Sequence, residues 1–155
     1  MSSGSEPAYR GGVGSRREAR ERALALLYES EAKSAPPSEV LAALPVPAEP
    51  YAAELVTGVG EHRDEIDALI RRFSRGWTLE RMPAIDRALL RMAVFELGHE
   101  PEVPTAAVIS EAVELAKTFS TEDSGRFVNG MLSAVAAELR DATPGVTGDQ
   151  AAPDR

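Results

Sequence analysis

The spacing of apolar residues constrains this chain most, because it is helical almost throughout. From about residue 15 to residue 140, apolar side chains recur three and four positions apart, and no window alternates strictly between apolar and polar residues. Prolines divide this pattern into segments, since proline lacks a backbone N–H and disfavours a helical conformation in the residue before it. The sequence therefore predicts an all-α fold, a compact bundle of about six or seven helices.

The segments between these breaks define the expected helices. They span about 15–33, 38–44, 51–73, 84–98, 105–119 and 122–140, with a short helical turn near 78–81. Segment 84–98 is apolar on nearly every face, so we expect it to be the most buried helix. Residues 1–14 and 142–155 are rich in Gly, Ser, Pro, Ala and Asp and lack periodicity, which predicts flexible tails on either side of a helical domain at 15–141.

The residue inventory excludes several kinds of site. The chain has no cysteine, so disulfides, thiol catalysis and Cys-ligated metals are excluded, and no stretch approaches the roughly 18–20 apolar residues of a membrane span. Its two histidines, His62 and His99, are far apart in sequence, and no His/Asp/Glu cluster has metal-ligand spacing. There is no glycine-rich phosphate loop and no nucleophile elbow. We therefore expect a cytoplasmic non-enzyme without a cofactor or metal.

The charge of the chain is unevenly distributed. The formal net charge of −8 argues against indiscriminate nucleic-acid binding, but the acidic residues concentrate between residues 39 and 67. Two stretches, 10–22 and 71–91, are locally basic through their arginines. In the first of these, Arg16, Arg17 and Arg20 have a spacing that places them on one helix edge, and arginine suits phosphate binding. On composition alone, a solvated helix face accounts for these arginines at least as well.

Two features near the C-terminus are not explained by an ordinary solvated helix face. Residues 119–127 place acids, hydroxyls, a glycine and an arginine at a helix–helix junction, where they can hydrogen-bond the edges of unpaired bases. Gly130 lies inside an otherwise strong helix at a cost of about 1 kcal/mol relative to alanine. A close approach of two helices is the simplest explanation for that glycine.

Several blocks of the sequence resemble the NusB family of bacterial transcription antitermination factors. The most specific similarity runs from Val103 to Leu132, through 109–119, 122–124 and 127–132. Residues 19–28 are similar to the family's arginine-rich N-terminal helix, and residues 85–97 to its central helix. The resemblance covers about 16–132 and implies an all-α fold of two three-helix-type halves.

The resemblance also implies a function and a set of contact residues. Members of the family bind the single-stranded boxA element of nascent RNA together with the small-subunit ribosomal protein that acts as Nus factor E. They support ribosomal RNA transcription as part of an antitermination complex on RNA polymerase. The resemblance carries RNA contact onto Arg16, Arg17, Arg20, Tyr28, Lys117, Phe119, Asp123 and Phe127. It carries contact with the partner protein onto Glu80 and Asp86, whereas Glu18 stands where the family is often basic.

The sequence leaves other states and functions open. Some family members form homodimers that cover the RNA-binding arm, and a NusB-like domain also occurs in ribosomal RNA methyltransferases, whose catalytic domain would need roughly another 200 residues. A helical protein-interaction module without RNA is a further alternative, motivated by the net charge. If RNA is the ligand, we expect weak binding by this acidic chain alone and strong binding beside a basic partner.

Overall fold

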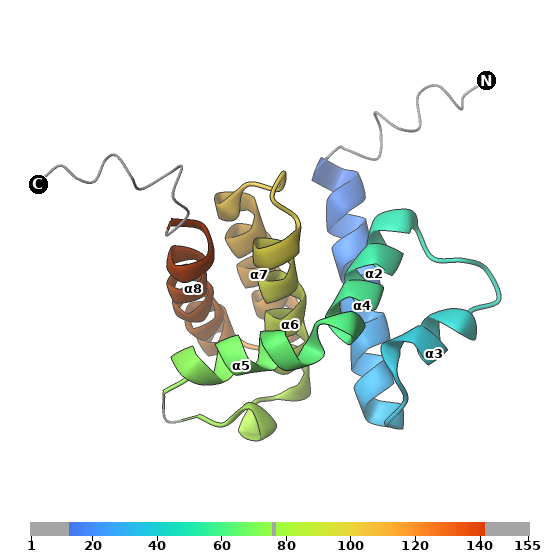
Figure 1. Ribbon diagram of the computed structural model, residues 1–155, viewed down its shortest axis with the longest axis horizontal. Coiled ribbons are helices and arrows are strands. Elements are labelled where there is room, and N and C mark those ends of the chain that lie inside the picture. The colour runs from blue at the N-terminus through green and yellow to red at the C-terminus, as the bar shows by residue number, and fades with distance from the viewer. Residues whose placement is uncertain (1–12, 76, 142–155) are drawn as a thin grey trace, which may run out of the picture. The chain divides into compact units, whose positions relative to one another are not determined.

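The computed structural model describes residues 13–75 and 77–141, and these residues contain seven α-helices and no strand (Figure 1), which confirms the all-α prediction. The helices are α2 (Val13–Lys33), α3 (Pro37–Ala42), α4 (Pro50–Glu61), α5 (Arg63–Phe73), α6 (Ala84–His99), α7 (Thr105–Phe119) and α8 (Glu122–Ala136). A 3₁₀ turn, η2 (Leu79–Arg81), precedes α6, and a π-helical turn, η3 (Ala137–Asp141), follows α8. The tails predicted at 1–14 and 142–155 lie outside the described residues, except that residues 13 and 14 belong to α2.

The helices form two units that divide between Glu61 and His62. In the first unit, α2, α3 and α4 pack against one another in all three pairings. Apolar side chains from each of these helices are buried there, namely Ala23, Leu26, Leu27, Val40, Leu55, Val56 and Val59. No helix in the part of the chain that the structure describes is both long and apolar enough to cross a membrane.

Helix α6 is the centre of the second unit. It packs against α5, α7 and α8, and every residue from Ala88 to Leu97 is buried, as the apolar pattern predicted. Two of these buried positions carry charge. Arg91 donates two hydrogen bonds, of 2.8 and 3.1 Å, to the two carboxylate oxygens of Asp67 on α5. A buried arginine is tolerated in this position because its planar fork matches a carboxylate.

A side chain from η3 caps the C-terminus of α6. Arg140 donates hydrogen bonds to the backbone carbonyls of Glu96, Leu97, Glu100 and Val103 and to Thr105 Oγ1, at 2.6–3.1 Å. The last carbonyls of a helix have no partner within the helix, and they form the negative end of its dipole. The guanidinium group therefore satisfies the C-terminus of α6 in both hydrogen bonding and charge.

The single helix predicted for 51–73 is two helices, α4 and α5, with a break at His62 (φ −112°, ψ 24°). The first buries its apolar face in the first unit, and the second buries Ile66 and Ile70 in the other. Gly58 and Gly60 also lower the helix propensity just before the break. Helical spacing continues through the break, so periodicity alone did not reveal it.

Candidate nucleic-acid interface

The predicted arginines of α2 lie beside a tyrosine of α4. The guanidinium carbon of Arg16 lies 4.0 Å from the centroid of the Tyr51 ring, and that of Arg20 lies 6.0 Å from it. Both distances fall in the range of cation–π contacts. Tyr51 was not predicted from the sequence, because nothing in the local pattern places it under the arginines of another helix.

The three arginines differ in exposure, so they do not form the uniform edge that their spacing predicted. Arg17 is exposed, Arg16 is half-buried, and Arg20 is only 4% exposed. Arg20 lies one helical turn beyond Arg16 on the same face, where it is buried close to Tyr51. Tyr28, farther along α2, is 44% exposed. We call Arg16, Arg17, Arg20, Tyr28 and Tyr51 the arginine face of the first unit.

In the second unit, hydroxyl groups hold the junction between α7 and α8. Thr121 caps α8 by accepting a 2.9 Å hydrogen bond from the backbone N–H of Ser124. The Ser124 hydroxyl lies 2.9 Å from that of Ser120 and donates a 2.7 Å bond to Asp86 Oδ2 on α6. These bonds fix the start of α8 against both neighbouring helices.

Asp86, for which the resemblance implied contact with the partner protein, points into the second unit, so that contact stays a prediction that its burial does not favour. Its side chain is fully buried at 0% exposure, and Ser124 uses one of its oxygens. The local sequence does not show this burial, because Ser124 lies far away along the chain. The residue supports the junction from inside the unit.

The predicted RNA-contact residues of the junction, by contrast, reach the surface. Phe119 is 48% exposed, Lys117 and Asp123 are exposed, and Phe127 is half-buried. Asp123 forms an ion pair with Arg126 one turn later. We call Lys117, Phe119, Asp123 and Phe127, with the serines beneath them, the α7–α8 junction.

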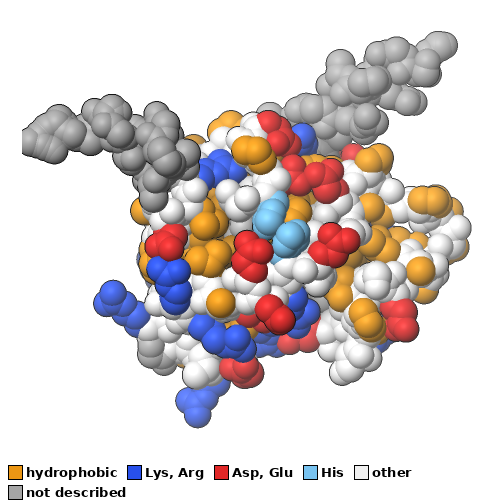
Figure 2. Space-filling model, viewed as in Figure 1, with side chains coloured by type: hydrophobic (Ala, Val, Ile, Leu, Met, Phe, Trp, Pro, Cys, Tyr) orange, Lys and Arg blue, Asp and Glu red, His pale blue; other side chains and the backbone are white. Residues whose placement is uncertain are grey.

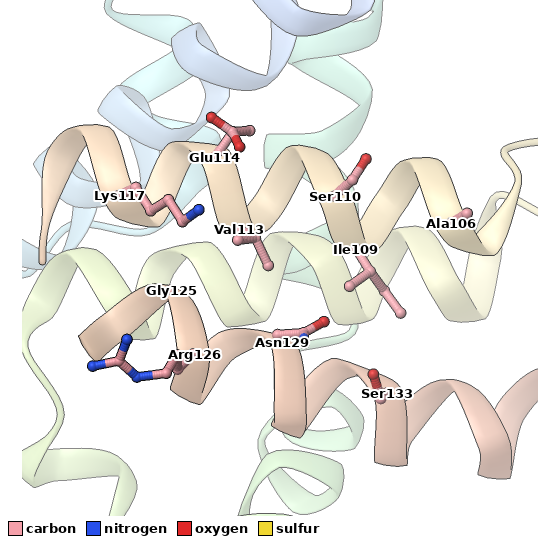
Figure 3. A pocket seen from close by; sticks show the side chains of 10 residues that line it. All are labelled: Ala106, Ile109, Ser110, Val113, Glu114, Lys117, Gly125, Arg126, Asn129 and Ser133. Carbon is pink, nitrogen blue, oxygen red and sulfur yellow. The ribbon is translucent and has the colours of Figure 1, made fainter. Parts of the chain in front are cut away.

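A groove of about 520 Å³ runs from this junction along α7 and α8 (Figure 3). Lys117 on α7 lies across from Gly125 and Arg126 on α8, and Asn129 and Ser133 continue the polar side of the groove. A Cβ atom at Gly125 would lie 3.1 Å from Lys117 Cγ, so this glycine allows the close approach. At Gly130, a Cβ would meet no atom within 4 Å, so the predicted explanation of that glycine by helix packing is wrong.

An exposed tryptophan extends the aromatic surface of the second unit. Trp77 is 39% exposed and packs edge-on against Phe127, with ring centroids 5.0 Å apart and an interplanar angle of 88°. Trp77 was not among the predicted site residues, although it is the only tryptophan of the chain and lies in the second basic stretch. A tryptophan among arginines was the signal in the sequence that could have identified it as a candidate for nucleic-acid contact.

Trp77 also lines a smaller hollow of about 440 Å³ together with Glu80 and Arg71. Glu80 is exposed and lies 3.1 Å from Arg71 Nη2. Hydrogen bonds from its own backbone N–H and from Arg71 lower the pKa of Glu80, so the group is an anion near neutral pH. This carboxylate is exposed at the surface, and its predicted contact with the partner protein stays a prediction.

Both surfaces combine exposed rings, cations and hydrogen-bonding groups on helical scaffolds. Such groups bind nucleic acids by stacking on bases and by neutralising phosphates. The structure therefore defines an all-α binding protein with surfaces suited to nucleic acid.

Comparisons with known proteins identify the family. The NusB family model matches residues 17–137. The transcription antitermination protein NusB of Acidothermus cellulolyticus is 48% identical over 132 residues, which cover 83% of this chain and 91% of that protein. NusB of Myxococcus xanthus is 47% identical over 137 residues, with 82% and 98% covered. The chain belongs to the NusB family of transcription antitermination proteins, which are not enzymes. This confirms the predicted family and the prediction that the protein is not an enzyme.

Solved structures agree with this assignment. T. maritima NusB matches with a TM-score of 0.72 and 33% identity, covering 79% of this chain and 91% of that one. A chain in the crystal structure of the antitermination factors NusB and NusE in complex with double-stranded RNA matches with a TM-score of 0.70 and 28% identity, covering 82% and 99%.

Proposed function

We propose that this chain binds single-stranded boxA-type RNA together with the ribosomal protein that acts as Nus factor E. In this role it supports ribosomal RNA transcription by RNA polymerase in the bacterial cytoplasm. The observation that carries the proposal is the α7–α8 junction, where the exposed ring of Phe119 lies in the same short segment as Lys117 and Asp123. The relative that forms a complex with NusE and RNA supports the same pair of ligands here.

Exposed aromatic rings favour an unpaired strand as the RNA ligand. Phe119 is 48% and Trp77 is 39% exposed, so each offers a face on which a base can stack. Bases of an A-form duplex are already stacked on one another, and their edges in the deep groove are out of reach of side chains. Asp123 and Lys117 supply an acceptor and a donor for base edges. The NusB–NusE relative was crystallised with double-stranded RNA, so both forms belong in the test.

The arginine face has a different role in this proposal. Arg17 and Arg16 contact phosphates, whereas the buried Arg20 holds Tyr51 and so positions Arg16. A chain with a net charge of −8 neutralises few phosphates in this way. We therefore expect a shallow salt dependence for this chain alone, with the basic partner supplying the remaining phosphate contacts.

Glu80 is the predicted partner-contact residue that the structure leaves at the surface. It is exposed, its ion pair with Arg71 is exposed as well, and like an ordinary glutamate it is charged near neutral pH. A basic ribosomal protein can compete for such a carboxylate at little cost, because an exposed pair contributes little to stability. Asp86 acts in this proposal only through Ser124.

The proposal is tested by fluorescence anisotropy with a labelled single-stranded boxA RNA and its duplex, with and without the ribosomal protein. Phe119→Ala should weaken single-strand binding by about fivefold to 150-fold, since one stacked base contributes about 1–3 kcal/mol. Val46→Ala is the matched control, because Val46 is an exposed apolar residue outside both surfaces. Arg17→Ala should reduce the slope of log K against log salt by about 0.7, and Lys33→Ala on the same helix should not.

Two results would overturn the proposal. One is equal binding by Phe119→Ala and Val46→Ala; the other is partner binding without any RNA binding, which would favour a protein-interaction module. Size-exclusion chromatography distinguishes a homodimer from the ternary complex. Three samples are compared: the chain alone, the chain with the partner protein, and the chain with both the partner protein and RNA. The relatives described above are antitermination proteins, which favours this function over that of a methyltransferase RNA-targeting domain.

A further inference from the structure

Both histidines of the chain meet at one point of the second unit. His62 precedes α5 and His99 is the last residue of α6, yet their rings stack with centroids 3.9 Å apart. Figure 2 shows the histidine side chains as one pale-blue patch at the molecular surface. The sequence predicted no such cluster, because the two residues are far apart in the chain. The packing of α5 on α6 brings them together.

A carboxylate lies against both imidazole rings. Glu65 is one helical turn after His62, and its Oε1 atom lies 3.3 Å from His62 Nδ1. Its other oxygen, Oε2, lies 3.4 Å from His99 Nε2. The three side chains can place one ligand atom each within 4.8 Å of the others. Two imidazole nitrogens and a carboxylate therefore converge on one small volume.

One atom of this cluster lacks the partner that its burial requires. His99 Nε2 is buried without a hydrogen bond, because its contact with Glu65 is close enough for an ion pair but does not have hydrogen-bond geometry. A buried ring nitrogen without a partner costs free energy unless a ligand or ion occupies the adjacent space. His62 is the N-cap residue of α5, but its side chain does not cap the helix; its Nδ1 atom instead shares a 3.3 Å hydrogen bond with Glu65 Oε1.

We propose that His62, Glu65 and His99 bind a divalent transition-metal ion, with Zn²⁺ as the best match. A tetrahedral zinc site with bonds of about 2.0–2.1 Å separates neighbouring ligand atoms by about 3.4 Å. Each imidazole nitrogen lies at about that distance from a different oxygen of Glu65, so a small rotation of the carboxylate brings one oxygen toward both. Imidazole ligands select ions such as Zn²⁺, Ni²⁺ or Cu²⁺, whereas Mg²⁺ and Ca²⁺ prefer oxygen ligands alone.

The surroundings suit a site with three protein ligands that is open to solvent. The side chains of His62, Glu65 and His99 are 35%, 56% and 30% exposed, so an ion can enter and water can complete its coordination. On the inner side, the ring of Phe95 stacks on His99 at 5.1 Å and lies 6.0 Å from His62. This apolar contact restricts the orientation of both imidazoles.

Isothermal titration of the full untagged chain with Zn²⁺ at about pH 7.5, where ordinary imidazoles are mostly neutral, tests the site. The probe is clean, because the chain has no cysteine and no other histidine. We expect one ion per chain, and binding at least about tenfold weaker in Glu65→Gln and His99→Gln. Asp64→Asn is the matched control, since Asp64 is an exposed acid in the same first turn of α5, and it should bind Zn²⁺ like the original chain.

A second measurement guards against misfolding of the histidine variant. Glu65 is exposed, so Glu65→Gln should fold normally, and Zn²⁺ should raise the melting temperature of the original chain and of Asp64→Asn but not of Glu65→Gln. The proposal is overturned if the original chain binds no stoichiometric Zn²⁺. Equal weakening by Asp64→Asn and Glu65→Gln would overturn it as well, since it would indicate diffuse attraction to acidic residues.

Discussion

Replacing Arg140 with alanine should destabilise the second unit by about 3 kcal/mol. The guanidinium group donates to five acceptors around the C-terminus of α6, and four of them are backbone carbonyls. A hydrogen bond from a charged donor contributes about 1.5–3 kcal/mol net, and a cation at a helix C-terminus adds about 0.3–1 kcal/mol. The expected loss is well below the simple sum, because the group is half-buried and water can satisfy some of the freed carbonyls.

Urea denaturation followed by tryptophan fluorescence measures this effect in the correct unit. Trp77 is the only tryptophan of the chain and belongs to the same unit as Arg140, so its signal follows that unit even if the other unfolds separately. With a slope of about 1–1.5 kcal/mol per molar urea, a loss of about 3 kcal/mol lowers the midpoint by about 2–3 M.

Two further variants distinguish the helix-end role from a general effect of charge. Arg140→Lys keeps the charge but loses the planar fork, so it should lie between the original chain and Arg140→Ala. Arg72→Ala removes a 3.0 Å surface pair with Glu138, in the same turn as Arg140, and should cost less than about 1 kcal/mol. The reasoning is refuted if Arg140→Ala is no more destabilising than Arg72→Ala.

Four other outcomes follow from the structure. Asp67→Ala leaves the buried Arg91 without its carboxylate and should cost about 3–5 kcal/mol in urea denaturation; a loss under 1 kcal/mol would contradict the buried pair. Ser124→Ala removes a hydrogen bond to a buried carboxylate and should cost about 2 kcal/mol by the same measurement. Gly130→Ala, in an exposed helix interior with free space, should stabilise the unit by about 0.5–1 kcal/mol; a decrease would show a hidden constraint. Because folding lowers the pKa of Glu80, this carboxylate contributes to folding stability above the ordinary pKa of 4.5, and the contribution is lost as the pH falls below that value. NMR titration should therefore give Glu80 a lower pKa than the other exposed glutamates.

The sequence predicted most helices well, because each apolar stripe is a local pattern. The ends expected for the helices at 84–98 and 105–119 differ from those of α6 and α7 by at most one residue. The break at His62 was missed because a helical period says that residues are buried, but not which core buries them. The π-helical turn after α8 was missed for a related reason, since Arg140 makes its contacts with a distant helix end.

The sequence predicted the residues of the candidate RNA surface that lie in one segment, but not the contacts between different helices. Lys117, Phe119 and Asp123 lie within one short segment, so the sequence brought them together and the structure places them at the surface. Tyr51 beneath Arg16 and Trp77 against Phe127 join residues of different helices, and neither pair was predicted.

The helical fold, the family and the short segments that carry the α7–α8 junction could all be predicted from the amino-acid sequence. The helices and these segments depend on residues a few positions apart, whose relative placement follows from the geometry of a single helix, and the family follows from several such local blocks along the chain. Which polar side chains reach solvent depends instead on how the helices pack, which buries Asp86 against Ser124, covers Arg20 and stacks His62 on His99. Burial and pairing depend on the neighbour that another helix supplies, and that neighbour is set by the packing of the whole unit.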